Sequence, residues 1–523
     1  MGTLKHQSTI QFALIKLLSY STISTALIVF FLNLKVTSFT YSSWYPILLE
    51  NSLLSTLIKL ILIWILMLGV YSLVLRTSRK IQVFLIVLIH VLAIIVKFII
   101  VFHTGNYPVA DSYLVLESAN AFAYNFNYIP DYLRVYLSHI PRQLGLVTLW
   151  IPLVKIFQFN LTRFLVFQVI LIQASLVLIS TSLYQWKGIR TALIGTILFN
   201  LFIPNSFLVL WVYGEPYTLF FLALALVFYI QRKRLSWYEA LMYVSLSLAY
   251  LARVTTNLWI LSLILVVVLQ KMDLSKKTVS ILALLTCLIL PYQALNLFYN
   301  PLIEQRPYPS NSWIRIGTGY SGFDGKTAAY YNDQIETDFM VYQENTNQMA
   351  QYNNEIILEN VETLWTTHQV IPFIIHKLEI TWTDPDFEMM TRMYPFYGSK
   401  LESPETLSQT VTYGSAEMNY QPTSSLGTWL QAQRSLILKF EKAFMLGLFS
   451  LVLLVLFMRK KKDAEDLFFI VVWLAHFAFY LLVEVKGRYT FILTNGMILY
   501  LSLHFEETFS GLLAKASRLL KKT

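Results

Sequence analysis

The sequence contains few charged residues and a single cysteine. Asp, Glu, Lys and Arg make up only 13% of its 523 residues, whereas soluble domains carry about 25%, and this composition excludes a soluble binding protein. The lone Cys287 lies inside an apolar run, so one chain has neither a disulfide framework nor a cysteine metal site. Internal repeats and low-complexity tracts are also lacking. The sequence therefore gives no sign of a duplicated architecture.

Long apolar runs are abundant instead. Hydrophobic residues make up 56% of the chain, and its mean hydropathy is +0.56. Many runs are about 20 residues long, which is enough to cross a hydrocarbon core of about 30 Å. They predict an all-α polytopic membrane protein with about twelve transmembrane helices. The expected spans are residues 10–32, 55–75, 80–102, 161–184, 190–211, 216–231, 237–252, 257–271, 278–298, 437–458, 465–484 and 490–506.

Basic residues follow a topological pattern in this scheme. They cluster in alternate loops, at Arg76, Arg79 and Lys80, Lys187 and Arg190, Arg232 to Arg234, Lys271, Lys276 and Lys277, Arg459 to Lys462, and Lys515 to Lys522. Cytoplasmic loops of membrane proteins carry an excess of Lys and Arg. We therefore expect a multi-pass cell-membrane protein with both termini in the cytoplasm. The net charge of +10 is then a topological signal, and no nucleic-acid partner is expected.

This topology depends on the apolar segment 141–157. Counting it as a span would move every later basic loop to the outer side. Pro141 and Pro152 limit the segment because proline interrupts a helix. We therefore expect a juxtamembrane or re-entrant helix at the outer surface, which also places Asp111 outside.

Four parts of the chain follow from this scheme. Residues 1–79 form two extra N-terminal spans, and residues 80–298 form a transmembrane core with an outer loop at 103–160. Residues 299–436 are polar, rich in Asn, Gln, Thr and Tyr, and too long for a passive connector. We expect a small, mostly helical extracellular domain there. The last part, 437–523, contains the final spans and a basic tail.

Acidic residues mark the outer side. Asp111 and Glu117 lie in YPVADSYLVLESANAF, where a spacing of six places them on different faces of a helix. Two solvated acids just past a helix end are the alternative. Glu215 occupies a very short outer turn, where an acid is costly unless it is paired, solvated or functional.

Basic residues accompany these acids in other outer turns, namely His139, Arg142, Arg253, Lys486 and Arg488. Each one alone is typical of a lipid-headgroup anchor, but together they favour a polar cavity at the outer interface. In such a cavity an acid can accept a proton from a hydroxyl. Arginines can hold a phosphate, and aromatic rings such as Tyr113, Trp313 and Tyr320 can stack on a sugar.

Several motifs give the chain a family resemblance. PVADSYLVLESA and SHIPRQLG resemble the catalytic outer loop and juxtamembrane helix of the GT-C superfamily of membrane glycosyltransferases. IPNSFLVLWVYGEPYTLFFLALALVFYIQRKR resembles its helix pair with an acidic outer turn, and VKGRYTFIL resembles its late Gly-Arg-Tyr motif. The chain is most similar to the protein O-mannosyltransferase and aminoarabinose-transferase branch, and to a group of large membrane proteins of Gram-positive bacteria. The resemblance covers about residues 80–506.

The resemblance implies an inverting transfer from an undecaprenyl-phosphate sugar to an extracytoplasmic glycan or other cell-envelope acceptor. Asp111 is the expected general base, and Glu215 and His139 are expected to orient it or the acceptor. The expected ligands of the donor phosphate are Arg488, Lys486, Arg253 and Arg142. The expected acceptor and sugar contacts are Glu117, Tyr113, Trp313, Tyr320 and Asp324.

The sequence departs from the family pattern in three ways. Two extra spans precede the core, Asp111 is followed by Ser112 rather than by an acid, and the outer turn holds only Glu215. The single acid weakens a metal site, so a divalent ion is not favoured, and Asp384-Pro385-Asp386 is expected to be a turn with two solvated acids. A flippase or transporter of lipid-linked glycans and a polymerase or ligase stay open as alternatives. The lack of duplication and the interfacial charges favour the transferase.

Overall fold

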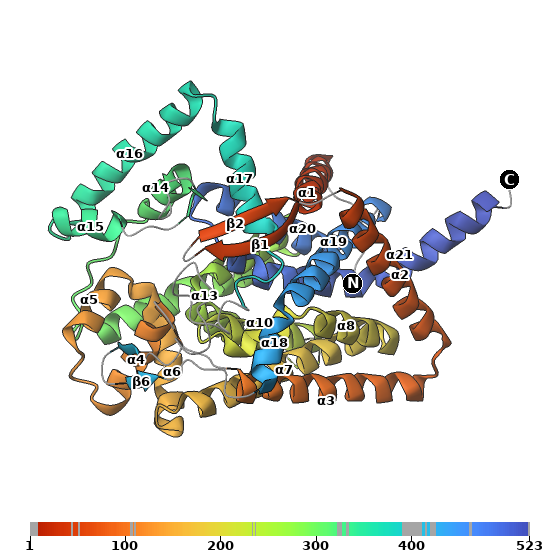
Figure 1. The fold of residues 1–523 in the computed structure, drawn as a ribbon, viewed down its shortest axis with the longest axis horizontal. Helices are drawn as coiled ribbons and strands as arrows, with labels where there is room; N and C mark the ends of the chain where they lie inside the picture. Colours follow the sequence, from red (N-terminus) through yellow and green to blue (C-terminus); the bar gives the residue numbers. More distant parts are fainter. Residues whose placement is uncertain are drawn as a thin grey trace.

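Helices make up most of the structure, which is a computed structural model (Figure 1). It describes the chain except residues 1–8, 43–44, 51–52, 105–107, 109–110, 233, 236, 322–326, 331–333, 390–410, 414–415, 419–424, 460–462 and 521–523. The described strands form three antiparallel pairs, which are β1 (Val36–Ser42) with β2 (Tyr45–Glu50), β3 (Tyr320–Ser321) with β4 (Thr327–Ala328), and β5 (Val411–Tyr413) with β6 (Ala416–Met418).

Apolar helices occupy all of the expected spans. They are α1 (Thr9–Lys35), α2 (Leu53–Arg76), α3 (Arg79–His103), α7 (Leu161–Lys187), α8 (Ile189–Leu201), α10 (Glu215–Gln231), α11 (Trp237–Ala252), α12 (Asn257–Leu269), α13 (Leu274–Tyr299), α19 (Arg434–Met458), α20 (Ala464–Leu482) and α21 (Phe491–Leu520). Seven helices of the described chain are long and apolar enough to cross a membrane, or nine if two bent pairs each count once. An all-α, multi-pass membrane protein is thus confirmed, whereas the number twelve stays a prediction.

The segment 141–157 does not form a straight span. The helix α5 (Asp131–His139) and the unit formed by η1 (Pro141–Gln143) and α6 (Leu144–Phe157) meet at a bend of 100°. The 14 residues of α6 rise about 21 Å at 1.5 Å per residue, less than the thickness of a hydrocarbon core. The bend is that of a broken span or a re-entrant loop, and the second of these is the arrangement expected from the sequence.

The expected span 190–211 is bent as well. After α8 the chain turns by 69° into α9 (Pro204–Phe207) and η2 (Leu208–Leu210). Pro204 has no backbone N–H to continue the helix, and the Asn205 side chain donates 3.0 Å bonds to Phe199 O and Asn495 Oδ1. The expected span is therefore a bent pair of helices, and the bend leads the chain into the turn before Glu215.

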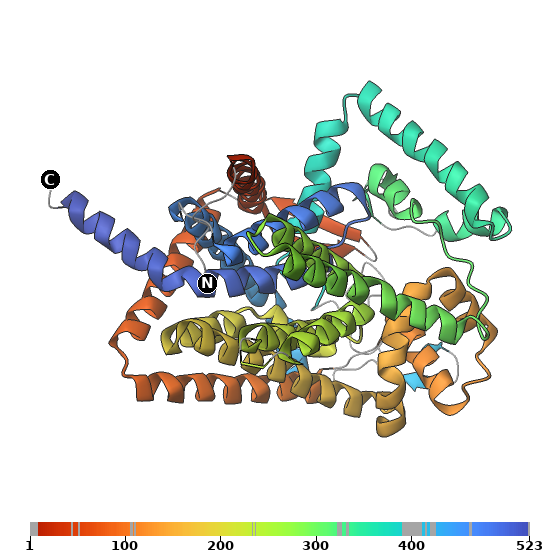
Figure 2. The same cartoon turned by 180° about the vertical axis from the view of Figure 1, so that it is seen from behind.

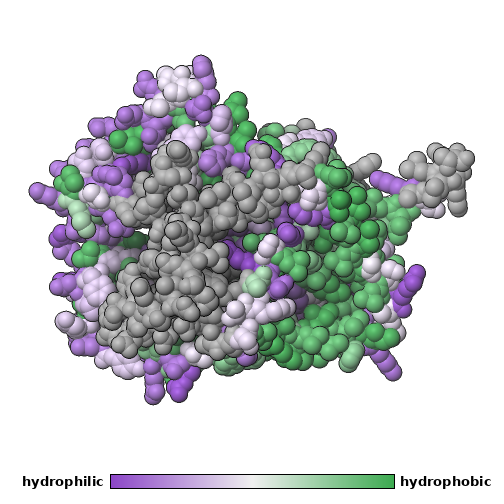
Figure 3. Space-filling model, in the orientation of Figure 1, coloured by the Kyte–Doolittle hydropathy of each residue, from purple (hydrophilic) through white to green (hydrophobic). Residues whose placement is uncertain are grey.

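The two ends of the helix bundle differ in character. Several of the alternate-loop basic residues meet at one end, where Arg190 lies 2.8 Å from Glu506 and Arg459 lies 2.8 Å from Glu507. The other end carries α4 (Asp111–Tyr124), α5 and the segment from α14 to α17. Figure 3 shows hydrophobic residues gathered over one half of the molecule and hydrophilic residues over the half that carries this segment.

The polar segment after α13 is mostly helical where it is described. Its helices are α14 (Ser312–Thr318), α15 (Gln334–Val341), α16 (Thr346–Thr366), α17 (Val370–Trp382) and α18 (Ser425–Ala432). Lys377 fixes it to the bundle, because its buried Nζ donates to Gly317 O at 2.6 Å and to Leu481 O at 2.9 Å. A side chain at Gly317 would collide with Leu482 O. The end of α20 and α14 therefore pack backbone to backbone.

Lys377 gives the fold a testable pH dependence. Burial lowers the pKa of its ammonium group from 10.5 to about 7. Because the unfolded chain then binds more protons between these two values, this group's contribution to stability rises with pH across that window. We expect the wild type to gain up to about 2 kcal/mol relative to Lys377→Met between pH 7 and pH 9. Thermal unfolding of both proteins at the two pH values measures this, and equal pH slopes would contradict it.

Candidate functional site

Glu215 begins α10 and is completely buried. One carboxylate oxygen forms an ion pair with the Arg253 guanidinium, and the other accepts a 2.8 Å hydrogen bond from Trp211 Nε1. The tight packing of Gly214 against Ala252 O, where a Cβ atom would collide, brings the two turns together. A buried acid in this turn was expected to need a partner, and Glu215 is paired with Arg253.

Arg488 lies on η5 (Gly487–Thr490) beside the same turn. Its guanidinium carbon is 5.1 Å from the Trp211 ring centre, 5.9 Å from that of Tyr213 and 5.6 Å from that of Tyr489. Arg253 faces the last two rings at 5.9 and 5.6 Å. Two guanidiniums therefore share two tyrosine rings, at distances typical of cation–π contacts.

The ion pair of Arg488 is loose. Its Nη1 is 3.8 Å from Glu388 Oε2, and its buried Nε has no hydrogen-bond partner in the described part of the chain. Buried guanidinium donors are normally satisfied. Arg488 therefore has donor capacity left for an anion that approaches the rings.

Asp111 is connected to this group through tyrosines. It begins α4 and is partly buried. Burial first, and then the negative charge of Asp111, raise the pKa of Tyr136 and of Tyr213. Gln143 donates a hydrogen bond to the Tyr213 hydroxyl, while Arg488 and Arg253 act on Tyr213 in the opposite direction to Asp111. The charges of the acid and of the two guanidiniums thus all act on Tyr213.

Arg142 joins the group from η1. Its guanidinium carbon lies 4.2 Å from the ring centre of Trp313, and its charge acts on both Tyr136 and Tyr489. Within the described residues, no carboxylate lies at ion-pair distance from Arg142. The structure therefore brings Arg142 and Trp313 together with the tyrosines that face Asp111 and Arg488.

Lys486 lies at the edge of the group. Its Nζ is 3.1 Å from Glu484 Oε1 and 5.7 Å from the ring centre of Tyr330. The charges of Arg488, Glu388 and Glu484 all act on the Tyr330 hydroxyl, whose pKa burial raises. Lys486 is therefore close to Arg488 but already has an acidic partner.

His139 faces the polar segment that follows α13. Its Nε2 is 3.7 Å from Glu344 Oε1, and its ring centre is 5.0 Å from that of Phe339 and 5.1 Å from that of Tyr308. Burial lowers the pKa of its imidazole, and Glu344 opposes this. These contacts join His139 to the polar segment, and its expected role in orienting Asp111 or the acceptor stays a prediction.

The expected acceptor contacts are scattered. Glu117 faces Tyr132 of α5, and Tyr113 is buried in α4. Tyr320 packs edge-on against Phe373 at 5.1 Å. Asp324 lies outside the described residues. Of the expected acceptor and sugar contacts, only Trp313 joins the group around Arg142 in the described structure.

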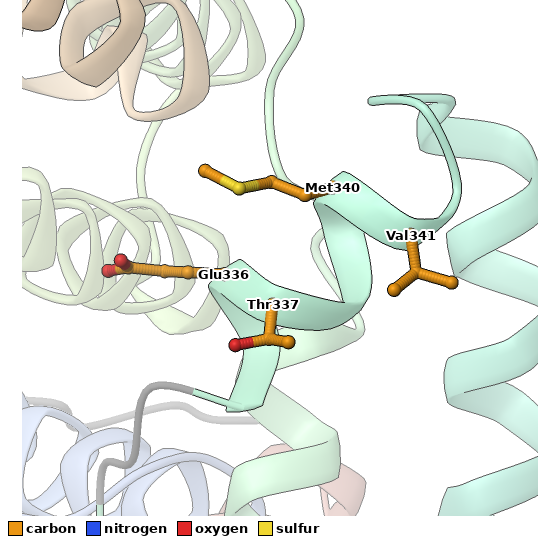
Figure 4. A pocket seen from close by; sticks show the side chains of 4 residues that line it. All are labelled: Glu336, Thr337, Met340 and Val341. Carbon is orange, nitrogen blue, oxygen red and sulfur yellow. The ribbon is translucent and has the colours of Figure 1, made fainter.

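An open hollow of about 530 Å³ lies on α15 and not at the arginines. Glu336, Thr337, Met340 and Val341 line it, and Figure 4 shows Glu336 and Met340 projecting to the same side of the helix. The charge of Glu336 acts on His139 and Tyr308. This hollow therefore adjoins the His139 region, and the polar cavity expected at the arginines stays a prediction.

The Asp384-Pro385-Asp386 turn is buried, so the expectation of two solvated acids was wrong. Both carboxylates are 2% exposed, and Asp384 Oδ1 accepts a 3.1 Å bond from the Asp386 N–H. A side chain at Gly487 would collide with Asp384, so this turn packs directly behind Arg488. Among the described residues, no group of three His, Cys, Asp or Glu side chains has the geometry of a metal site.

Comparison of the chain with known protein families, characterised proteins and solved structures finds no match.

Four aromatic residues of the site were not singled out from the sequence. They are Tyr136, Trp211, Tyr213 and Tyr489. A signal for two of them exists in the sequence WVYGEP, where Trp211 and Tyr213 lie four and two residues before Glu215. Tyr489 directly follows Arg488. For Tyr136, the sequence signal is its position three residues before His139.

Proposed function

We propose that the protein is an inverting GT-C-type glycosyltransferase that uses a polyprenyl-phosphate sugar and acts at the outer face of the membrane. The observation that supports this most strongly is that the charge of Asp111 acts on Tyr213, whose ring the guanidiniums of Arg253 and Arg488 also face. A general base and anion-binding groups are the two components that such a transfer needs. The positive-inside rule supports an extracytoplasmic position for this end of the bundle.

Arg488 and Arg142 are the proposed ligands of the donor phosphate. Both have capacity for an anion, since among the described residues the ion pair of Arg488 is 3.8 Å long and Arg142 is stacked on Trp313. Guanidiniums bind phosphate oxygens with two parallel N–H donors. Arg253 is held by Glu215, so it contributes fixed positive charge. Lys486, paired with Glu484, takes an assisting role.

The proposed chemical step has one base and one leaving group. Asp111 takes the proton of the acceptor hydroxyl while the hydroxyl oxygen bonds to the anomeric carbon. The bond from that carbon to the phosphate oxygen breaks, and its electron pair goes to the phosphate. The lipid phosphate leaves as an anion beside the arginines, so it needs no general acid. Attack opposite the leaving group inverts the anomeric centre.

Glu215 acquires a different role from the one expected from the family resemblance. Because it is fully buried and bonded to Arg253 and Trp211, we propose that it positions this arginine and this ring. In the proposed mechanism, Asp111 contacts the acceptor and Glu215 does not.

A deletion strain of the host bacterium tests the function. We expect mass spectrometry of its cell-surface glycans to show one missing sugar substituent on an otherwise unchanged backbone, restored by the wild-type gene. Accumulation of complete lipid-linked glycan units would instead indicate a flippase or polymerase and would overturn the proposal. An unchanged glycan profile would also contradict it.

A further inference from the structure

An exposed apolar surface lies at the turn between α16 and α17. We define the α16–α17 ridge as Leu358, Val361, Trp365, Ile371, Ile374 and Ile375. Trp365 is 74% exposed, Ile371 71% and Leu358 69%. Single exposed apolar residues are common, but a contiguous group on a polar unit marks an interaction surface.

The ridge follows helical spacing on both helices. On α16, Leu358, Val361 and Trp365 are three and four residues apart and so share one face. The mean direction of the acids of this helix, Glu355, Glu359 and Glu362, differs from that of the ridge by about 95° at 100° per residue, and Glu359 is the farthest from it. The face is therefore separated from the acidic one. It also differs from the buried side that holds Met349 and Leu364.

The α17 part of the ridge has the same organisation. Ile371, Ile374 and Ile375 share one exposed face, while Phe373 and Lys377 point into the protein. A helix with an apolar face that is not covered by its own protein is typical of an interfacial membrane helix.

The ridge continues into the lipid-facing surface of the bundle. The C-terminal part of α17 packs on the outer end of α1, where Asn33 Nδ2 donates to Trp382 O at 3.0 Å and Lys35 Nζ lies 3.1 Å from Glu379. Directly before these contacts, α1 exposes Ile28 and Phe31 at 45% and 61%. Exposed apolar residues therefore lie on α1 beside this contact and on the first turns of the same α17.

The orientation of α17 agrees with this continuity. In Figures 1 and 2, α17 runs across the direction of α3, which is a candidate span. Figure 3 shows hydrophobic atoms on the side of the projecting tip that faces the apolar half.

We infer that the α16–α17 ridge is seated in the headgroup–acyl boundary of the outer leaflet, with Trp365 in the interface. Trp is enriched at this depth because its ring is apolar and its N–H is polar. The bilayer surface is the occupant that the continuity with α1 favours, and a second copy of the chain is an outcome of the test. In this position the polar segment is attached to the bundle through Lys377 and to the lipid through the α16–α17 ridge.

Site-specific labelling of the full-length protein tests whether the α16–α17 ridge lies in the membrane interface. The variant Cys287→Ser removes the chain's lone cysteine, and Trp365→Cys or Ile371→Cys then places an environment-sensitive fluorophore on the ridge. Glu359→Cys on the acidic face of the same helix is the matched control. Each protein is reconstituted in nanodiscs with and without phospholipid that carries a nitroxide quencher near the headgroup end of its acyl chain.

We expect quenching at positions 365 and 371 to exceed that at 359 by at least about threefold, with blue-shifted emission only on the ridge. Equal quenching at all three positions would contradict the membrane contact of the ridge. Strong blue shift without lipid quenching, in discs that contain two copies by mass photometry, would assign the ridge to a second copy and would overturn it as well. Because all three positions are exposed, labelling does not disturb the core.

Discussion

Replacing Asp111 with asparagine is expected to slow sugar transfer by about 10²- to 10⁴-fold, the usual contribution of a general base. Asparagine keeps the size of the side chain but cannot take the acceptor's proton. The initial rate of transfer by purified protein, measured at saturating donor, reports this loss. Because Asp111 is only partly buried at the start of α4, the thermal unfolding midpoint should change little.

Glu117→Gln is the matched control for Asp111→Asn. Both acids lie on α4, but Glu117 faces Tyr132 and not the arginine-bound tyrosines. The proposed mechanism therefore predicts a nearly normal rate for Glu117→Gln. A rate near that of the wild type in Asp111→Asn would remove Asp111 from the role of base. Equal losses in both variants would indicate a general need for acids on α4.

The sequence is sufficient to predict an all-α, multi-pass membrane protein and the need of Glu215 for a partner, but not the identity of that partner. Apolar run length alone locates the helices, because each run must satisfy its backbone internally in a bilayer. The cost of an acid in the short turn at Glu215 predicts that it needs a partner, and Arg253 in the next outer turn supplies it. In contrast, the bend after α8 depends on a side-chain bond from Asn205 to the distant Asn495, which sequence periodicity does not encode.

The other residues of the site show why local patterns are insufficient. Tyr213 belongs to the site because α4, η1 and η5 meet around it, and such convergence depends on packing between elements that are far apart in sequence. The sequence motif suggested that His139 orients Asp111 or the acceptor, but it did not predict that the His139 ring packs on Phe339 and Tyr308. Asp384 and Asp386 are polar in sequence but buried, because Gly487 allows their turn to pack behind Arg488.

Replacing Glu215 with alanine is expected to produce the largest loss of stability, about 3–5 kcal/mol, because it leaves Arg253 buried without its counter-ion. Arg253 is 9% exposed, and Trp211 Nε1 also loses its acceptor. Thermal unfolding in detergent and in nanodiscs measures the loss. Asp111→Asn, which breaks no ion pair of the described structure, is the reference for an activity loss without unfolding.

The double variant Glu215→Met, Arg253→Met separates positioning from stability. Removing both charges together is often neutral or stabilising, so we expect it to recover most of the unfolding midpoint lost in Glu215→Ala. If Glu215 acts by holding Arg253 and its positive charge at the rings, transfer should stay low in the recovered protein and the KM for the donor should rise. Recovery of both stability and rate would show that the pair serves only the fold. An unchanged midpoint in Glu215→Ala would contradict the pair's stabilising role itself.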